Sequence, residues 1–355
     1  MTGLDTSSAE LASPPTQPLG ERDITRVALS RMAGRVIDRT VELGFTRWFW
    51  GEGVCAQAML RATDALGSPP PQVIFDYFDS FAACPPIIEH VNNLVSGASA
   101  CVMYQRTGDD SYRSLADRCL HWYEGSPGAT RDGAGTLEHW PGGVWADTVY
   151  MAGSFLLQYG RLFNRPDLIE QAIDQWLLHA SALSIDDSGL IVHGTHRGEA
   201  LPAFWGRANA WFAMAGVDLL RFTPSGISAQ KTVWIRERLN AQLLALIRIQ
   251  PEHGVWDVLV DSQPESTGIL ESSAAAGIGA AMLRFSRLTG DDQFYCAGKR
   301  STLGALAYLK DGWLTRVSAG TVLQLVPFGY SVIRDDRAQS WGQGLALEAI
   351  AALLE

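Results

Sequence analysis

The sequence predicts an all-α protein, an (α/α)6 barrel of about twelve helices with short strands in the loops of one mouth. Two patterns lead to this prediction. Amphipathic helices alternate with helices that are apolar on nearly every side, and one kind of joint returns about every 60 residues, the length of a helical hairpin with its loops. Six such hairpins closed into a ring bury the apolar helices and leave no exposed end. An open solenoid is the alternative, but solenoids usually show tighter repeats and polar capping units.

The segments 167–183 and 268–284 illustrate the two kinds of helix. In the first, Leu168 and Trp176 share an apolar face while acidic and amide side chains occupy the other, which is typical of a surface helix. In the second, GILESSAAAGIGAAMLR, only Glu271 and the two serines after it are polar, so other helices must cover it on every side. Helices are expected at 21–43, 51–66, 70–83, 93–107, 110–123, 147–163, 166–182, 205–222, 229–249, 268–288, 292–309 and 338–354.

The joints between these helices share a signature. Each ends an apolar helix with Gly or Asn and opens an amphipathic one with Asp or Pro, the residues that suit helix C-termini and N-termini. The joints are RTGDDSY (106–112), FNRPDL (163–168) and LTGDDQF (288–294), and TPSGISAQ (223–230) occupies the same kind of position.

The composition indicates a protein with a large core, 47% hydrophobic and 19% charged, with a net charge of −10. Such a chain has no basic stripe, so neither nucleic acid nor an anionic membrane is expected as a partner, although local arginines can still bind a small anion. Residues 1–20 are rich in Ser, Thr and Pro without an apolar signal region, and we expect a disordered tail before a single barrel domain at 21–355. No run is apolar enough to span a membrane, and the five cysteines form no C-x-x-C pair. We therefore predict a cytoplasmic protein with buried, reduced thiols; its oligomeric state stays open.

Long irregular segments precede the inner helices of the predicted barrel. They therefore gather at one mouth of the ring, where a functional cleft is expected. Two stretches near this mouth, LIVHG (190–194) and VWDVLVD (255–261), are predicted as short strands. The long segments are 124–146, 184–204, 250–268 and 311–337.

The stretch VWADTVYM (144–151) places Asp147 where a glycine-rich run turns into an apolar helix. A lone Asp at that position often serves as a helix cap. Trp140, Trp145 and Tyr150 flank it, however, and an acid among aromatic rings is expected to have a raised pKa and to donate a proton. We interpret Asp147 as a catalytic acid.

Tryptophans gather before the inner helices, which favours a carbohydrate ligand because flat sugar faces stack on indole rings. Core packing is the alternative for any single ring. In FWGRANAWF, Arg207 shares a helix face with Trp211, and Asn209 shares the neighbouring face with Trp205. Arg207 fits either a ligand carboxylate or a structural ion pair with an acid of the barrel. The tryptophans are Trp48, Trp50, Trp140, Trp145, Trp205, Trp211 and Trp256.

Neither a metal nor an organic cofactor is predicted. His193 and His196 lie three residues apart without a third ligand nearby, which is a weak metal signal. An ordinary glycosidase places two carboxylates around the scissile bond. Glu52 and Glu271 both begin inner helices, but neither has a context that marks it as the second acid.

The motifs VWADTVYM, GLIVHG, FWGRANAW and ILESSAAA, in this order, resemble glycoside hydrolase family 105. These are the unsaturated rhamnogalacturonyl hydrolases, related to the unsaturated glucuronyl hydrolases of family 88. The resemblance covers most of the chain from WFWGEG onward and implies an (α/α)6 barrel with Asp147 as the catalytic acid. The predicted substrate contacts are Trp50, Trp145, His193, Trp205, Arg207, Asn209 and Trp211.

One departure concerns HVNNLVSG, where family members usually carry a second Asp near the start of the fourth helix. Asn92 and Asn93 stand there instead. An asparagine can hydrogen-bond a sugar or water but cannot act as a base, so both are predicted substrate contacts and the departure points to altered substrate choice or low activity.

The resemblance implies the removal of a Δ4,5-unsaturated uronic acid from the non-reducing end of lyase-produced oligosaccharides. Hydration of the vinyl ether needs one general acid that returns as a base, here Asp147, which accounts for the missing carboxylate pair. The motifs do not choose between galacturonyl and glucuronyl substrates. Two other classes fit the same features: another sugar-active barrel, either an N-acylglucosamine 2-epimerase or an ordinary glycosidase, and a sugar-binding barrel without activity. Epimerases use paired histidines deep in the barrel, and histidine is scarce on the inner helices here.

Overall fold

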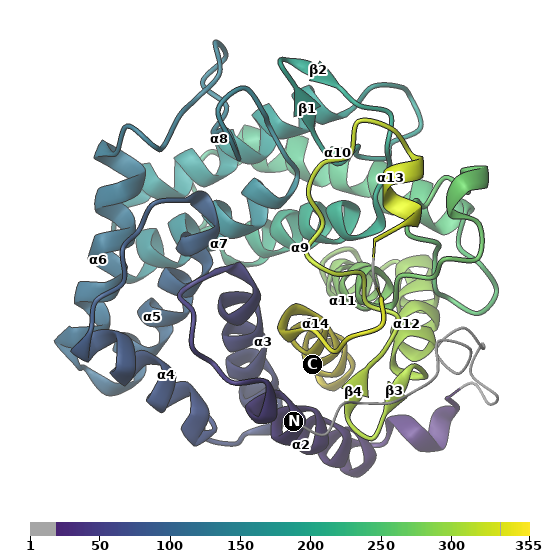
Figure 1. Cartoon of the computed structure of the whole chain (residues 1–355), viewed down its shortest axis with the longest axis horizontal. Helices are drawn as coiled ribbons and strands as arrows, with labels where there is room; N and C mark the ends of the chain where they lie inside the picture. Colours follow the sequence, from purple (N-terminus) through teal and green to yellow (C-terminus); the bar gives the residue numbers. More distant parts are fainter. Residues whose placement is uncertain (1–18, 334) are drawn as a thin grey trace.

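The computed structural model describes residues 19–333 and 335–355 and shows two concentric rings of helices (Figure 1). In this part of the chain the inner helices each contact the next, and the last contacts the first, so the ring is closed. The predicted (α/α)6 barrel is therefore confirmed, whereas most of the predicted tail, 1–20, lies outside the described residues. The inner helices are α3 (Trp50–Leu66), α5 (Leu94–Thr107), α7 (Asp147–Leu162), α9 (Gly206–Phe222), α11 (Ser272–Thr289) and α14 (Ser340–Leu354).

The outer ring covers the inner one and supplies the amphipathic helices. Its members are α2 (Arg26–Leu43), α4 (Gln72–Ala83), α6 (Asp110–Gly125), α8 (Pro166–Leu183), α10 (Ala229–Arg248) and α12 (Asp292–Leu306). Every predicted helix is present. The largest differences are at two starts: α11 begins at Ser272 because Glu271 caps it, and the first predicted helix is divided at Thr25 into η1 (Glu21–Ile24) and α2. The short η2 (Val91–Asn93), η3 (Pro264–Ser266) and α13 (Phe328–Ser331) were not predicted as separate elements.

The recurring joints have the predicted chemistry. Gly108 and Gly290 end α5 and α11 in the left-handed conformation, with φ of 72° and 73°. The next residues, Asp109 and Asp291, then accept a backbone N–H bond of 2.8 Å from two residues further on and so cap the outer helices. The same Gly-Asp capping arrangement thus connects an inner helix to the following outer helix at two places in the chain.

The prediction for α11 also holds, since each residue from Ser272 to Ser286 is buried. Two glycines permit this packing. A Cβ on Gly277 would lie 2.9 Å from the Cβ of Ala210 in α9, and one on Gly279 would lie 2.8 Å from a methyl of Thr302 in α12. Glycine is therefore needed on both sides of α11 for close approach to its neighbours.

The strand predictions for 190–194 and 255–261 were wrong. These stretches make only isolated bridges, one of them from Gly194 to Trp145, because each passes the start of an inner helix and pairs with several partners in turn. The strands of the described part form two short antiparallel hairpins, β1 (Thr195–His196) with β2 (Glu199–Ala200), and β3 (Leu309–Lys310) with β4 (Trp313–Leu314).

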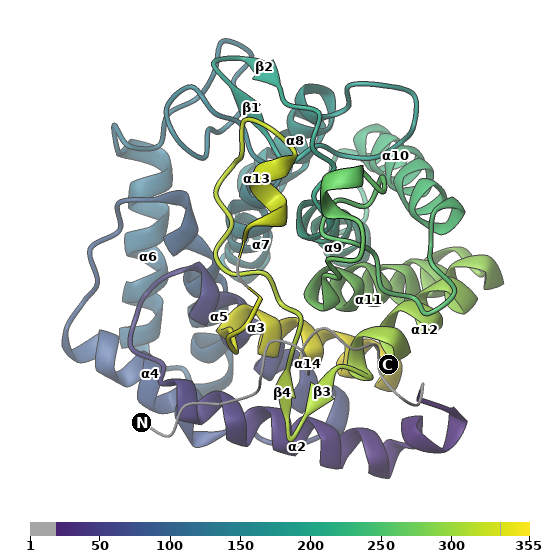
Figure 2. The same ribbon diagram turned by 45° about the vertical axis from the view of Figure 1, so that its right-hand side comes forward.

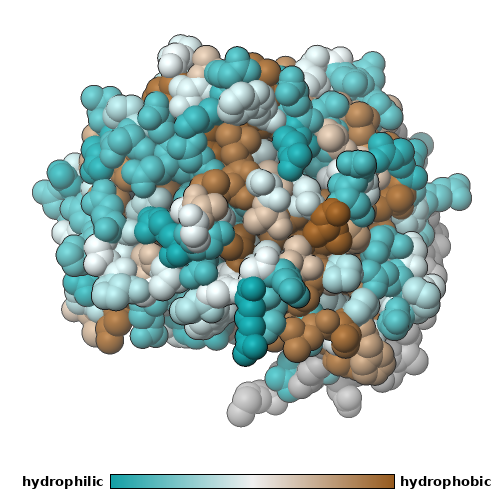
Figure 3. Space-filling model, turned by 90° about the horizontal axis from the view of Figure 1, so that it is seen from above, coloured by the Kyte–Doolittle hydropathy of each residue, from teal (hydrophilic) through white to brown (hydrophobic). Residues whose placement is uncertain are grey.

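Within the described residues no helix is both long and apolar enough to cross a membrane. Seen from above, apolar side chains form separate patches among polar ones (Figure 3). All five cysteines are free; three are buried as predicted, but Cys84 and Cys296 are exposed.

Candidate active site

A cavity of about 200 Å³ lies where the inner helices begin. Its walls come from the starts of α3, α7 and α9, from η2 ahead of α5, and from the segment 311–337, which crosses in front of the ring (Figures 1 and 2). The helices α3, α7 and α9 thus direct their N-termini, and the positive ends of their dipoles, towards one small volume. The lining residues are Phe49, Trp50, Asn92, His139, Trp140, Trp145, Asp147, Trp205, Arg207, Gly320, Thr321 and Val322.

Asp147 is the first residue of α7, but no side-chain cap is found at the start of this helix. Its carboxylate instead faces the cavity, with its side chain 14% exposed, and Oδ2 lies 3.4 Å from Nε2 of His193. Neither atom has a hydrogen-bond partner within the described residues, so the two groups lie close together without completing a hydrogen bond. The helix-cap interpretation of Asp147 is therefore not supported, and the carboxylate is available to a ligand.

The expected raised pKa of Asp147 was wrong. Burial does raise it, but the adjacent imidazole of His193 and, less strongly, the charge of Arg207 outweigh burial and hold the pKa below its ordinary value. The sequence showed the indole rings around this acid but not the imidazole and guanidinium that the fold brings to it from 46 and more residues away.

Tyr330 of α13 fixes the other side of His193. Its hydroxyl lies 2.7 Å from Nδ1 of His193 and accepts a weak bond of 3.5 Å from the backbone N–H of Gln324. Because the hydroxyl already accepts from Gln324, and burial raises the pKa of Tyr330, it is well placed to donate to Nδ1. The tautomer that results has its proton on Nε2, pointing at Asp147.

We expect Tyr330→Phe to lower kcat/KM roughly tenfold, because His193 would no longer be held in this tautomer. The variant should also change the pH dependence of kcat/KM while the unfolding temperature moves little. Tyr295→Phe, at an exposed tyrosine of α12, is the matched control. Unchanged rates and pH profile in Tyr330→Phe would contradict this role.

His139 is a cavity residue that the sequence analysis missed. Its ring stacks on Trp145 with centroids 4.5 Å apart, and its nitrogens lie 3.3 Å from the amide of Asn92 and 3.1 Å from the hydroxyl of Thr148. Burial lowers the pKa of His139 to about 3, so the ring is neutral. It therefore holds Trp145 and Asn92 in place beside the acid. The signal available in the sequence was its position next to Trp140 in the loop before Asp147.

Arg207 is fully buried and largely committed to the protein. Its guanidinium donates to Glu271 at 3.0 Å, to the carbonyl of Ser318 at 3.0 Å and to the carbonyl of Ala319 at 2.9 Å. Of the two interpretations left open by spacing, the structure supports the ion pair with a barrel acid. Arg207 nevertheless lines the cavity, lies over the Trp205 ring at 4.5 Å, and keeps Nε without a partner among the described residues.

Four predicted substrate contacts do not line the cavity. One is His193, which is fully buried and contacts Asp147 instead. The other three bond or pack within the protein. Asn93 bonds backbone groups of Trp48, Glu89 and His90; Asn209 bonds Ile191, Trp205 and Gln242; Trp211 packs against Tyr150 in the core. Asn209 and Trp211 fail because a periodicity of 3.6 places residues on a face of a helix but not at its end. Asn93 was predicted from the position of the family's second Asp, and its side chain is used by backbone groups instead. Trp48 and Trp256, predicted at the mouth, are likewise buried away from the cavity.

Asp147 is the one acid among the described residues that line the cavity. Glu52 is buried and pairs with Arg47 at 2.8 Å, and Glu271 pairs with Arg207, so neither serves as a second carboxylate. His196 lies in β1 on the surface, and within the described residues no three His, Cys, Asp or Glu side chains are grouped to hold a metal.

A closed barrel of paired helices whose small, mostly apolar mouth holds several indoles and, among the described residues, one acid is typical of a carbohydrate-active protein. The chain belongs to Glycosyl Hydrolase Family 88, whose family model matches residues 26–355, and it is a glycoside hydrolase. The predicted family resemblance is thereby confirmed. The chain is 31% identical over 341 residues to the unsaturated rhamnogalacturonyl hydrolase YesR of Bacillus subtilis, covering 90% of this chain and 93% of that protein.

Solved structures share the fold. One is a possible member of the GH105 family from Salmonella enterica, with a TM-score of 0.84 and 24% identity over 96% of this chain and 97% of the other. Another is the unsaturated glucuronyl hydrolase of Bacillus sp. GL1, with a TM-score of 0.69 and 17% identity over 90% and 94% of the two chains.

Proposed function

We propose that this glycoside hydrolase removes a Δ4,5-unsaturated uronic acid from the non-reducing end of an oligosaccharide, with Asp147 as general acid and base. The observation that carries the proposal is that the described residues place a single carboxylate, that of Asp147, in the cavity wall. Direct displacement at the anomeric carbon needs two acids, whereas hydration of a vinyl ether needs one. The name of the Bacillus subtilis relative, an unsaturated rhamnogalacturonyl hydrolase, supports the same class of substrate.

In the proposed reaction Asp147 gives its proton to C4 of the sugar, and water adds at C5. The carboxylate left on Asp147 takes a proton from that water, so the acid is restored. The resulting hemiketal opens by breaking its ring C–O bond, and the hemiacetal formed at C1 then releases the neighbouring sugar. The net change is the addition of one water to the double bond followed by cleavage of the glycosidic link.

The mouth supplies the binding groups for such a substrate. Trp50, Trp140 and Trp145 line the cavity and offer aromatic surface for a sugar ring, and Asn92 offers an amide. The buried Nε of Arg207 and Nε1 of Trp205 have no partner in the described part of the chain, and together with the helix N-termini they favour the uronate carboxylate. An entering carboxylate also displaces water and adds negative charge beside Asp147, and both effects raise the protonated fraction of this acid.

The test is incubation with unsaturated digalacturonate, with an unsaturated rhamnogalacturonyl disaccharide and with unsaturated glucuronyl disaccharides. Turnover removes the conjugated double bond and hence its ultraviolet absorbance, and the three substrates report the uronate preference. Binding by calorimetry without any loss of absorbance would instead identify a sugar-binding barrel without activity.

The lowered pKa of Asp147 gives a direction for the pH dependence. Above its pKa, the protonated fraction of the free enzyme falls tenfold with each pH unit. We therefore expect kcat/KM to rise as the pH is lowered from about 8 to about 5, with a slope near one logarithmic unit per pH unit. Initial rates at constant ionic strength measure this, and a flat profile across the range would show that the proton comes from another group.

A further inference from the structure

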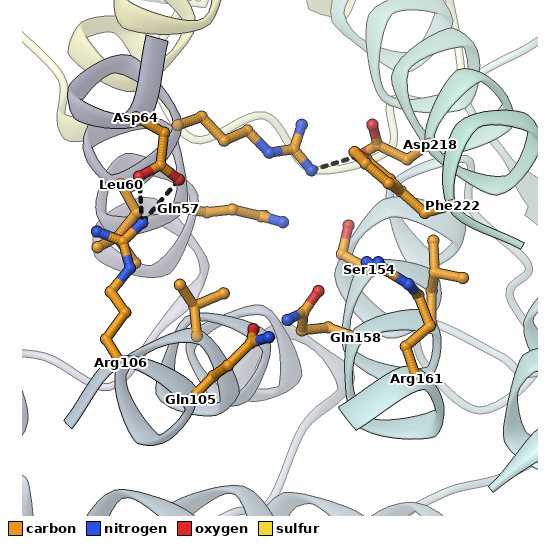
Figure 4. A pocket seen from close by; sticks show the side chains of 13 residues that line it. Gln57, Leu60, Asp64, Gln105, Arg106, Ser154, Gln158, Arg161, Asp218 and Phe222 are labelled. Atoms are coloured by element: carbon orange, nitrogen blue, oxygen red, sulfur yellow. Dashed lines mark hydrogen bonds and ion pairs between the residues drawn. The ribbon is translucent and has the colours of Figure 1, made fainter. Parts of the chain in front are cut away.

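A second cavity lies at the opposite end of the inner ring, and neither the fold nor the proposed reaction accounts for it. It has a volume of about 530 Å³, against about 200 Å³ for the candidate active site. Its walls are the C-terminal halves of the neighbouring helices α3, α5, α7 and α9 (Figure 4). The residues that line it are Gln57, Leu60, Arg61, Asp64, Val102, Gln105, Arg106, Ser154, Leu157, Gln158, Arg161, Asp218 and Phe222.

The floor of this cavity holds polar groups without partners. Gln57 and Ser154 are 8% and 6% exposed, and neither Oε1 of Gln57 nor Oγ of Ser154 has a hydrogen-bond partner in the described part of the chain. Both side chains point into the cavity from different helices, and the amide of Gln158 also points inward (Figure 4). Buried polar atoms are nearly always satisfied, so a hydroxylated ligand or ordered water is expected between them.

The charges beside the cavity are balanced with one exception. Arg106 pairs with Asp64 at 2.7 Å. Arg61 pairs with Asp218 and belongs to a network in which three arginines meet three acids, namely Arg61, Arg221 and Arg284 with Asp218, Glu348 and Glu355. Arg161, by contrast, is exposed to solvent, lies over the ring of Phe222 at 5.0 Å and makes no ion pair with any described residue.

The position of Arg161 in the last turn of α7 explains part of its presence, because a cation there complements the helix dipole. The dipole does not explain the unpartnered groups on the floor. A molecule with hydroxyls for Gln57 and Ser154 and one carboxylate for Arg161 would satisfy both ends of the cavity.

We propose that this cavity, which we call the rear cavity, binds a small hydroxylated carboxylate of the sugar-acid class. The assignment does not depend on the proposed reaction, because no residue of the rear cavity lines the candidate active site. A sugar acid bound there would act as an effector or a second ligand, about one helix length from Asp147.

The full-length protein is titrated by calorimetry with three probes. Galacturonate carries both hydroxyls and a carboxylate, galactose carries hydroxyls alone, and propionate carries a carboxylate alone. We expect galacturonate to bind at least about tenfold more tightly than either of the others. Arg161→Met should weaken galacturonate roughly tenfold, and Ser154→Ala should weaken it less. Arg113→Met is the control. Arg113 of α6 also lies over a phenylalanine ring at 5.0 Å but, unlike Arg161, pairs with Asp117 at 3.6 Å.

The variant Trp50→Ala distinguishes binding in the rear cavity from binding in the candidate active site. It should leave the affinity of the rear cavity for galacturonate unchanged. Crystals soaked in galacturonate should show the sugar between Gln57 and Arg161. Water alone in the rear cavity of such crystals, or binding that neither Arg161→Met nor Ser154→Ala weakens, would overturn the proposal.

Discussion

Asp147→Asn should lower kcat on an unsaturated uronyl disaccharide by roughly 10³-fold, within the 10²-fold to 10⁴-fold range of general acid catalysis. Asparagine has nearly the same shape, so the contacts of the start of α7 and the stacked Trp145 should survive. What is lost is the proton that must reach C4 of the substrate. Because this proton is needed only in the transition state, KM should change much less than kcat.

The control for this variant is Asp187→Asn, an exposed acid in another of the mouth segments, 184–204. Loss of the ultraviolet absorbance of the substrate measures both rates. If Asp147→Asn retains more than about a tenth of the activity, which is a loss far below the usual general-acid range, the acid lies elsewhere. Calorimetry with the same disaccharide separates lost chemistry from lost binding.

The fold could be predicted because its signals are local and repeated. The joints at Gly108 and Gly290 carry their own capping chemistry, and the apolar surface of α11 can only be buried in the centre of a ring. The short strands could not be predicted in the same way. Their pairing depends on which segments pass each other at the mouth, and a stretch such as 255–261 has the composition of a strand without a continuous partner.

Most of the predicted residues that line the cavity stand at or near the start of an inner helix, although Asn93 at the start of α5 does not line it. Trp50, Asp147 and Trp205 all stand at such starts and reach the cavity. The role of Tyr330 could not be predicted, because this residue lies in the segment 311–337, far along the chain from His193, which it contacts. The sign of the pKa shift of Asp147 failed for the same reason, since the groups that lower it come from distant segments.

Glu271 shows how the segment 311–337 is held over the cavity. As the N-cap of α11 it accepts from the backbone N–H of Ala274, and it also accepts from Arg207 at 3.0 Å and from the backbone N–H of Ser318 at 2.9 Å. The carboxylate is fully buried, so one charge joins α9, α11 and the segment that carries Thr321 and Val322 into the cavity wall.

Glu271→Gln should therefore lower the free energy of unfolding by about 3 kcal/mol, the lower end of the range for a buried ion pair that loses one partner. Glutamine fills the same space but leaves the buried guanidinium of Arg207 without a counter-charge. The midpoint of urea unfolding measures this loss, and Glu265→Gln, at an exposed glutamate shortly before α11, should change it by less than about 0.5 kcal/mol. KM should also rise, because the cavity wall at Thr321 loses its anchor. Equal unfolding midpoints for the two variants would mean that Arg207 is neutralised by another group, with Asp147 the nearest candidate.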